Sequence, residues 1–341
     1  MSILSQLMAR GRRLARVYLL AVGVLAGPAY TMYVHYDFSH SIDTRSYLSI
    51  AHGEFAGQSL TRRYRVLVPA MAAAVAWPVA RVYARVWPQR AATDWPLRLA
   101  FYLVNTVLLA AAGVVLYCTC RRYAATPAAA ALAMVAVLSS RWAVYMAGLP
   151  LVDSLYVLVF ALAFYGVRAR SAGALAAVLL LGPLAKESFV FLVPWLLWFG
   201  RAALPWPRQL GGLAVGSALA LVVRLWIDQR AGAPFAASVT NALDHFQNVS
   251  YSLSRLFSVK GVGEIFSIFG FFWLALPVGA GRPGLAPLGA PALWFGGVVV
   301  AHMLLSGELA RMGYLAAPVF AVALARVLAG LPGLCERPAV A

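Results

Sequence analysis

Charged side chains that could do chemistry are few in this sequence, and many of them flank apolar runs. The stretch HYDFSHSIDTRSYLSIAHGEF, residues 35–55, follows the first apolar run and contains Asp43. A carboxylate at this position could act as a general base, and partial burial would help to set its pKa near the working pH. Asp43 also precedes Tyr47, Leu48 and Ile50 as the N-cap of an interfacial helix would. The sequence leaves both interpretations open.

The run RRYRVLVP, from Arg62 to Pro69, brings three guanidinium groups to the start of the next apolar run. Arg62 and Arg63 fit contacts with lipid headgroups. Arg65 lies closer to the apolar residues and is the better phosphate ligand, because the guanidinium fork matches phosphate oxygens.

Further ionisable residues occur far along the chain. Asp153 in AGLPLVDSLY falls in the first turn of a predicted helix, where capping explains an acid as well as function does. Lys186 and Glu187 could neutralise each other, although a Lys at the tip of a short hairpin also suits an anionic ligand. Glu308 and Arg311 in SGELARMGYL have the i,i+3 spacing of a simple ion pair.

The composition defines the class of protein that carries these residues. Hydrophobic residues make up 62% of the 341 residues and charged residues only 11%, which predicts an integral membrane protein. The formal net charge of +17 would suggest nucleic acid as a partner of a soluble protein. Here the arginines mark helix ends, so we expect membrane lipids and no nucleic acid as partners. The predicted fold is an all-α polytopic helix bundle.

The apolar runs predict about ten transmembrane helices in a single integral membrane domain, 1–341. Basic residues before the first run put the N-terminus in the cytoplasm. If 66–87 crossed the membrane, the later arginine clusters would all lie outside, so we expect this segment to be interfacial. The expected spans are 16–35, 96–118, 124–140, 149–167, 172–185, 188–200, 209–227, 263–280, 288–306 and 312–330.

Two features of this arrangement bear on function. The segment 37–95 becomes one long first extracytoplasmic loop with interfacial helices, within a core module 1–230 that is followed by C-terminal helices at 231–341. Pro183 and the charged pair after it split 172–200 into two short pieces, which predicts a hairpin that ends in a cavity.

In this order of features, the sequence resembles the GT-C superfamily of membrane glycosyltransferases, which use polyprenyl-phosphate sugars. RYRVLVPAMA follows the long first loop; SSRWAVYMAGLPLVDS is similar to an outer loop of the glycosylphosphatidylinositol mannosyltransferases; and LLGPLAKESFVFLVPWLLW is similar to the Lys-containing hairpin of the protein mannosyltransferase and aminoarabinose transferase branches. The resemblance covers roughly the first 230 residues.

The resemblance implies an inverting glycosyltransferase in the inner or plasma membrane, with its site on the extracytoplasmic face. The donor would be a polyprenyl-phosphate-linked sugar, and the acceptor a lipid, glycan or protein. Asp43 takes the position of the general base. The implied substrate-binding residues are Arg65, Arg141, Asp153, Lys186, Glu187 and Arg311. No cofactor is expected; a divalent metal is possible, but the spacing of His, Asp and Glu residues does not support one.

Two other classes of protein fit the same residues. A carrier or flippase for an anionic lipid or solute would use inward-facing arginines to bind phosphate without chemistry. A non-catalytic scaffold with a GT-C-like fold is favoured by the first loop, where Asp37 and Glu54 are the only near companions of Asp43, whereas many relatives carry paired acids. Fold alone does not separate these classes.

Overall fold

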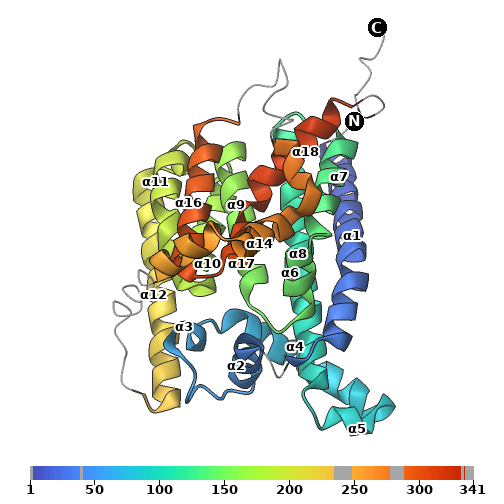
Figure 1. Ribbon diagram of the computed structural model, residues 1–341, viewed down its shortest axis with the longest axis vertical. Coiled ribbons are helices and arrows are strands. Elements are labelled where there is room, and N and C mark those ends of the chain that lie inside the picture. The colour runs from blue at the N-terminus through green and yellow to red at the C-terminus, as the bar shows by residue number, and fades with distance from the viewer. Residues whose placement is uncertain (1–2, 39–40, 234–247, 277–287, 332–333, 335–341) are drawn as a thin grey trace.

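The computed structural model describes residues 3–38, 41–233, 248–276, 288–331 and 334, and all the regular structure in these ranges is helical (Figure 1). The α-helices of the first half are α1 (Ile3–His35), α2 (Ile42–Ala51), α3 (Leu60–Arg63), α4 (Leu67–Val86), α5 (Pro88–Ala91), α6 (Trp95–Arg122), α7 (Pro127–Leu138), α8 (Arg141–Gly148) and α9 (Asp153–Ala169). The second half contains α10 (Ala172–Ala185), η2 (Glu187–Leu192), α11 (Val193–Phe199), η3 (Gly200–Ala202), α12 (Trp206–Ala231), α14 (Val259–Phe269), η4 (Gly270–Leu274), α16 (Ala290–Ser306), α17 (Leu309–Gly313), η5 (Tyr314–Ala316) and α18 (Ala317–Ala329).

Several of these helices are long and apolar enough to span a membrane, as expected for an integral membrane protein. Five segments meet that test in the described residues: Gly11–His35, Leu67–Val86, Trp95–Arg122, Trp206–Ala231 and Leu309–Ala329. Two bent pairs, Pro127–Gly148 and Asn248–Leu274, bring the number to seven if each is one span. The count differs from the predicted ten in two ways. The predicted spans 149–167, 172–185, 188–200 and 288–306 form helices of at most 17 residues, and Leu67–Val86, expected to be interfacial, is long and apolar enough to span. Residues 277–280 of the predicted span 263–280 lie outside the described residues.

Helix α6 lies at the centre of the first half of the bundle and packs against α1, α4 and α9. Its buried Asn105 fixes the start of α9, because the side-chain amide donates hydrogen bonds to the carbonyl oxygens of Leu149 and Leu151 at 2.9 and 3.1 Å. The oxygen of the same side-chain amide accepts a hydrogen bond from the hydroxyl of Ser154. A polar side chain inside a helix bundle thereby sets where Asp153 emerges.

The short helices that follow α1 lie at one end of the bundle. In Figure 1 the start of α1 and the end of α18 are at one end, and α2, α3 and α5 are at the opposite end. Tyr47 of α2 accepts a hydrogen bond at 3.3 Å from Arg65, just before α4. His52, the residue after α2, lies 3.2 Å from Asp94, between α5 and α6. Arg65, before α4, and Asp94, after α5, therefore both lie close to α2, at the same end of the bundle.

The break that the sequence predicts within 172–200 is present. Helix α10 ends at Ala185, Lys186 is extended, and a 3-10 turn begins at Glu187. Tyr156 and His302 hold this turn: the Tyr156 hydroxyl lies 2.7 Å from His302 Nε2 and accepts from Ser188 Oγ at 3.2 Å. The charged pair therefore sits on backbone fixed by two other helices.

Candidate functional site

Ion pairs join segments from across the chain at the end of the bundle where α2 and α3 lie. Helix α2 brings Asp43, the segment after α3 brings Arg65, the α10–η2 break brings Lys186, and α17 brings Arg311. With Asp153 at the start of α9, these residues form the charged cluster described below.

Asp43 is held by two arginines. Its Oδ1 accepts from Arg62 Nε at 2.5 Å, and its Oδ2 accepts from Arg311 Nη1 at 2.8 Å. Ser41, rather than Asp43, is the N-cap of α2, because its hydroxyl accepts from the backbone N–H of Thr44. The capping interpretation of Asp43 is therefore wrong, and its carboxylate points toward the other charged segments.

The protonation of Asp43 also differs from the expectation. Burial alone would raise the pKa of Asp43, but the guanidinium groups of Arg311 and Arg62 outweigh burial and hold the pKa below the ordinary value of 3.8. The prediction of a pKa near the working pH is wrong for this arrangement of side chains. Asp43 is a fully ionised carboxylate at neutral pH.

Asp153 and Lys186 form a buried pair behind Asp43. Lys186 Nζ lies 3.2 Å from Asp153 Oδ1, and Arg311 Nη1 lies 3.5 Å from Asp153 Oδ2. The ion-pair partner of Lys186 is therefore Asp153, which lies 33 residues earlier in the chain. Arg311 links the two aspartates, and it also pairs with Glu308, as the i,i+3 spacing predicts.

Glu187 pairs instead with Arg65. Arg65 Nε donates to Glu187 Oε2 at 3.1 Å, and Nη2 donates to the other carboxylate oxygen, a two-point arrangement that fixes the guanidinium plane. The third nitrogen of Arg65 reaches the Tyr47 hydroxyl. Buried Tyr47 thus ties the guanidinium to the helix that carries Asp43.

The charged cluster lines a cavity of about 250 Å³, here called the inner polar cavity. Four cations and four carboxylates meet in and behind this cavity, so their formal charges cancel. Arg311 Nε is buried and has no hydrogen-bond partner among the described residues. The residues of this balanced set are Arg62, Arg65, Lys186 and Arg311 with Asp43, Asp153, Glu187 and Glu308.

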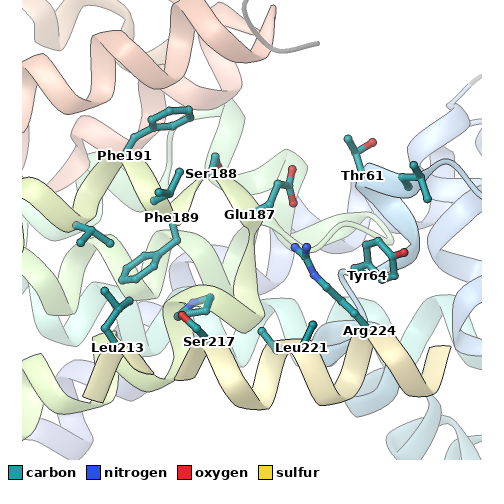
Figure 2. Close-up of a pocket in the computed structure, with 15 residues that line it drawn as sticks. Thr61, Tyr64, Glu187, Ser188, Phe189, Phe191, Leu213, Ser217, Leu221 and Arg224 are labelled. Carbon is teal, nitrogen blue, oxygen red and sulfur yellow. The ribbon is translucent and has the colours of Figure 1, made fainter. Parts of the chain in front are cut away.

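An apolar cavity of about 470 Å³ adjoins the inner polar cavity and shares Thr61, Glu187, Ser188 and Phe191 with it. It lies between the α10–η2 segment and α12. Figure 2 shows Phe189, Phe191 and Leu213 at one end and the polar groups of Thr61, Tyr64, Glu187 and Arg224 toward the other. The space is therefore amphipathic along its length.

A third cavity, here called the outer polar cavity, has a volume of about 760 Å³ and lies on the other side of Asp43. Asp43, Glu308 and Arg311 line both polar cavities. Arg141 lines only the outer polar cavity, at the start of α8, so the structure separates it from Arg65 and Lys186. The other predicted site residues lie together around the inner polar cavity.

Sequence reasoning missed several members of the site. Arg62 and Arg63 were assigned to lipid headgroups. In the structure Arg62 pairs with Asp43, and Arg63 Nη1 lies 3.5 Å from Asp228 Oδ1. Asp228 is buried and accepts from the Tyr64 hydroxyl at 2.8 Å. A lone acid in the long apolar helix α12 was the available signal for Asp228, since such a charge usually has a partner.

The described residues contain no group of three or more His, Cys, Asp or Glu side chains arranged to hold a metal ion. The carboxylates Asp43, Asp153 and Glu187 pair with arginine and lysine side chains.

The comparisons with known proteins identify no relative: no family model, no curated protein and no solved structure matches this chain.

Proposed function

We propose that this integral membrane protein is a glycosyltransferase that moves a sugar from a polyprenyl-phosphate donor to an acceptor on the extracytoplasmic face. The observation that carries the proposal is the position of Asp43. Its carboxylate lines the inner polar cavity on one side and the larger outer polar cavity on the other. One carboxylate can therefore face both a phosphate-linked sugar and an acceptor hydroxyl.

The donor would occupy two adjoining cavities. Its isoprenoid chain suits the apolar cavity against α12, because α12 is the least buried of the five long apolar helices. Its phosphate suits the inner polar cavity, where Arg65, Lys186 and Arg311 converge. Since every cation there already has a carboxylate partner, the phosphate has to compete for guanidinium N–H groups, and the buried Nε of Arg311 is one such donor.

The reaction would proceed by direct displacement. An acceptor hydroxyl in the outer polar cavity gives its proton to Asp43 as its oxygen attacks the anomeric carbon from the face opposite the phosphate. The bond between the anomeric carbon and the phosphate oxygen breaks, and the polyprenyl phosphate leaves with the electron pair. Lys186 and Arg311 stabilise the negative charge that grows on the phosphate, and the anomeric configuration inverts.

The orientation in the membrane is part of the proposal. The N-terminus and C-terminus would be cytoplasmic, and the end of the bundle with α2, α3 and α5 would face the outside. The hydrogen bonds that tie Tyr47 to Arg65, before α4, and His52 to Asp94, after α5, support an interfacial 66–87, although α4 is long and apolar enough to span by itself.

The test replaces Asp43 by Asn in the full-length protein. Asn cannot accept the acceptor's proton at neutral pH, so transfer should fall by roughly a hundredfold or more. The loss of a charged partner for Arg62 and Arg311 should cost about 1–3 kcal/mol of stability, so rates are compared per folded protein. Glu54→Gln is the matched control, because Glu54 is an exposed acid of the same loop.

The assay uses purified protein with labelled polyprenyl-phosphate mannose and polyprenyl-phosphate aminoarabinose as donors, and membranes of a deletion strain as the source of acceptor. Donor binding should persist in Asp43→Asn. Near-normal transfer by Asp43→Asn would overturn the proposed mechanism. Passage of the donor across vesicle membranes without any transfer by the wild type would instead show a carrier.

A further inference from the structure

The outer polar cavity differs from the inner one in how its cations are paired. Arg255 pairs with Glu264, and Arg311 pairs with Asp43 and Glu308. The remaining charged side chains of this cavity are Arg141 and Lys260, which form no ion pair with any described residue. Among the described residues, the outer polar cavity therefore carries two cations without carboxylate partners, whereas each cation of the inner polar cavity has one.

The same cavity has an aromatic wall that is held rigid. Tyr145 packs edge-on against Trp142 and Tyr36, with ring centroids 5.4 and 5.8 Å apart. Trp142 Nε1 donates to Ser267 Oγ at 3.2 Å, and the hydroxyls of Tyr36 and Tyr145 are 3.4 Å apart. The cavity volume of about 760 Å³ falls in the range of small-molecule sites, roughly 300–1,000 Å³.

These two features specify the ligand by its chemistry. An aromatic wall offers a flat apolar surface for the C–H face of a sugar ring, and cations at its edge select a ring that carries an anionic group. The general-base candidate Asp43 lines the same cavity, so a ring on the aromatic wall would share the cavity with this carboxylate.

We propose that the outer polar cavity is the acceptor site and that the acceptor is an anionic carbohydrate, whose carboxylate or phosphate is bound by Arg141 and Lys260 while its ring packs against Trp142 and Tyr145. This assignment rests on the proposed transferase function and adds the acceptor class to it. It also gives Arg141 a role on the acceptor side, apart from the cations that face the donor phosphate.

The test measures sugar binding directly, so it does not depend on transfer. Methyl glucuronide and methyl glucoside have the same ring and differ by a carboxylate in place of a hydroxymethyl group. Saturation-transfer NMR with the full-length protein in neutral-lipid nanodiscs should show binding of the glucuronide and at least tenfold weaker binding of the glucoside. Glucose 6-phosphate, compared with glucose, tests the phosphate form of the anion.

Arg141→Gln combined with Lys260→Gln should abolish the preference for the anionic sugar. Arg85→Gln combined with Arg208→Gln removes two exposed cations outside this cavity and should leave the preference intact. Trp142→Ala should weaken both glycosides. Equal binding of charged and neutral sugars by the wild type, or a preference that survives in the Arg141 and Lys260 variant, overturns the assignment. Transfer to neutral acceptors only would overturn the anionic acceptor and leave the transferase proposal standing. Full transfer by Asp43→Asn with intact glucuronide binding would overturn the proposed mechanism and leave the anionic acceptor standing.

Discussion

At the scale of single residues, the sequence identifies which side chains gather at the site better than it identifies their partners. Asp43, Arg65, Lys186 and Arg311 were predicted to contribute, and they do lie around one cavity. Their pairing was not predictable, because local spacing suggested Lys186 with Glu187, whereas the fold pairs Lys186 with Asp153. Partners that are more than a hundred residues apart, such as Arg65 and Glu187, leave no periodic pattern.

The two arginines on Asp43 lead to a prediction about pH. A carboxyl whose folded pKa lies below its unfolded pKa contributes stability at pH values above the unfolded pKa, and this contribution is lost as the pH falls through the folded pKa. In a plot of kcat/KM against pH, the acid limb reports the pKa of the general base in the free enzyme. For Asp43 we expect this limb to lie below the ordinary aspartate range, because Arg311 and Arg62 lower its pKa.

Arg62→Gln should move this limb to higher pH, because one of the cations that lower the pKa of Asp43 is then absent. The control is Arg45→Gln, which removes an exposed cation from the same helix without an ion pair to Asp43. Profiles of kcat/KM against pH for the three proteins provide the measurement. The role of Arg62 is refuted by an unmoved limb in Arg62→Gln, and equally by the same movement in Arg45→Gln.

At the scale of elements, the sequence predicted a helix break where residues at the break itself disfavour a continuous helix. Pro183 and the charged pair after it marked the end of α10. A predicted span ended at residue 140 and 141–148 was assigned to the loop before the next span. In the structure the chain continues as α8 after a 63° bend, and Ser140 caps α8 by accepting from the backbone N–H of Ala143. Ser140 alone did not predict α8, because a serine can cap a new helix or form hydrogen bonds within a turn.

The packing of α10 on α12 gives a prediction at this scale, because it shapes the apolar cavity. A Cβ on Gly216 would lie 2.3 Å from the carbonyl oxygen of Leu179, so the two helices approach as closely as glycine allows. Gly216→Ala should lower the thermal midpoint in detergent and weaken donor binding. Gly211→Ala on the same helix should raise stability by roughly 0.5–1 kcal/mol, since nothing lies within 4 Å of its added Cβ. A Gly216→Ala protein as stable as Gly211→Ala would show that this close approach does not matter.

At the scale of the whole molecule, composition identifies a membrane helix bundle, but hydropathy alone does not give the number of crossings. The described helices include five long apolar segments and several of 17 residues or fewer. Short helices can be buried behind longer ones. The end of α10 and the start of η2 place Lys186 and Glu187 at the inner polar cavity. A sequence profile treats them like any other apolar run.

Thiol labelling tests the topology. In a protein that lacks Cys118, Cys120 and Cys335, single cysteines at Glu54 and Ala92 should both react with an impermeant reagent applied from outside. Both positions are exposed, and the His52–Asp94 contact brings their neighbourhoods together. A cysteine at Arg122, at the far end of α6, should react only after the membrane is permeabilised. Protection at position 92 alone would mean that 66–87 crosses the membrane.

The contact between Asp43 and Arg311 joins residues that are 268 positions apart. A ribosome has therefore made nearly the whole chain before the arginine that links Asp43 to Asp153 exists. Until then the two carboxylates of the early helices lack one of their cations, and the cavities on either side of Asp43 lack the wall that α17 provides. The charged cluster is therefore complete only after residue 311 has been made, and a chain that stops earlier lacks the arginine that joins Asp43 to Asp153.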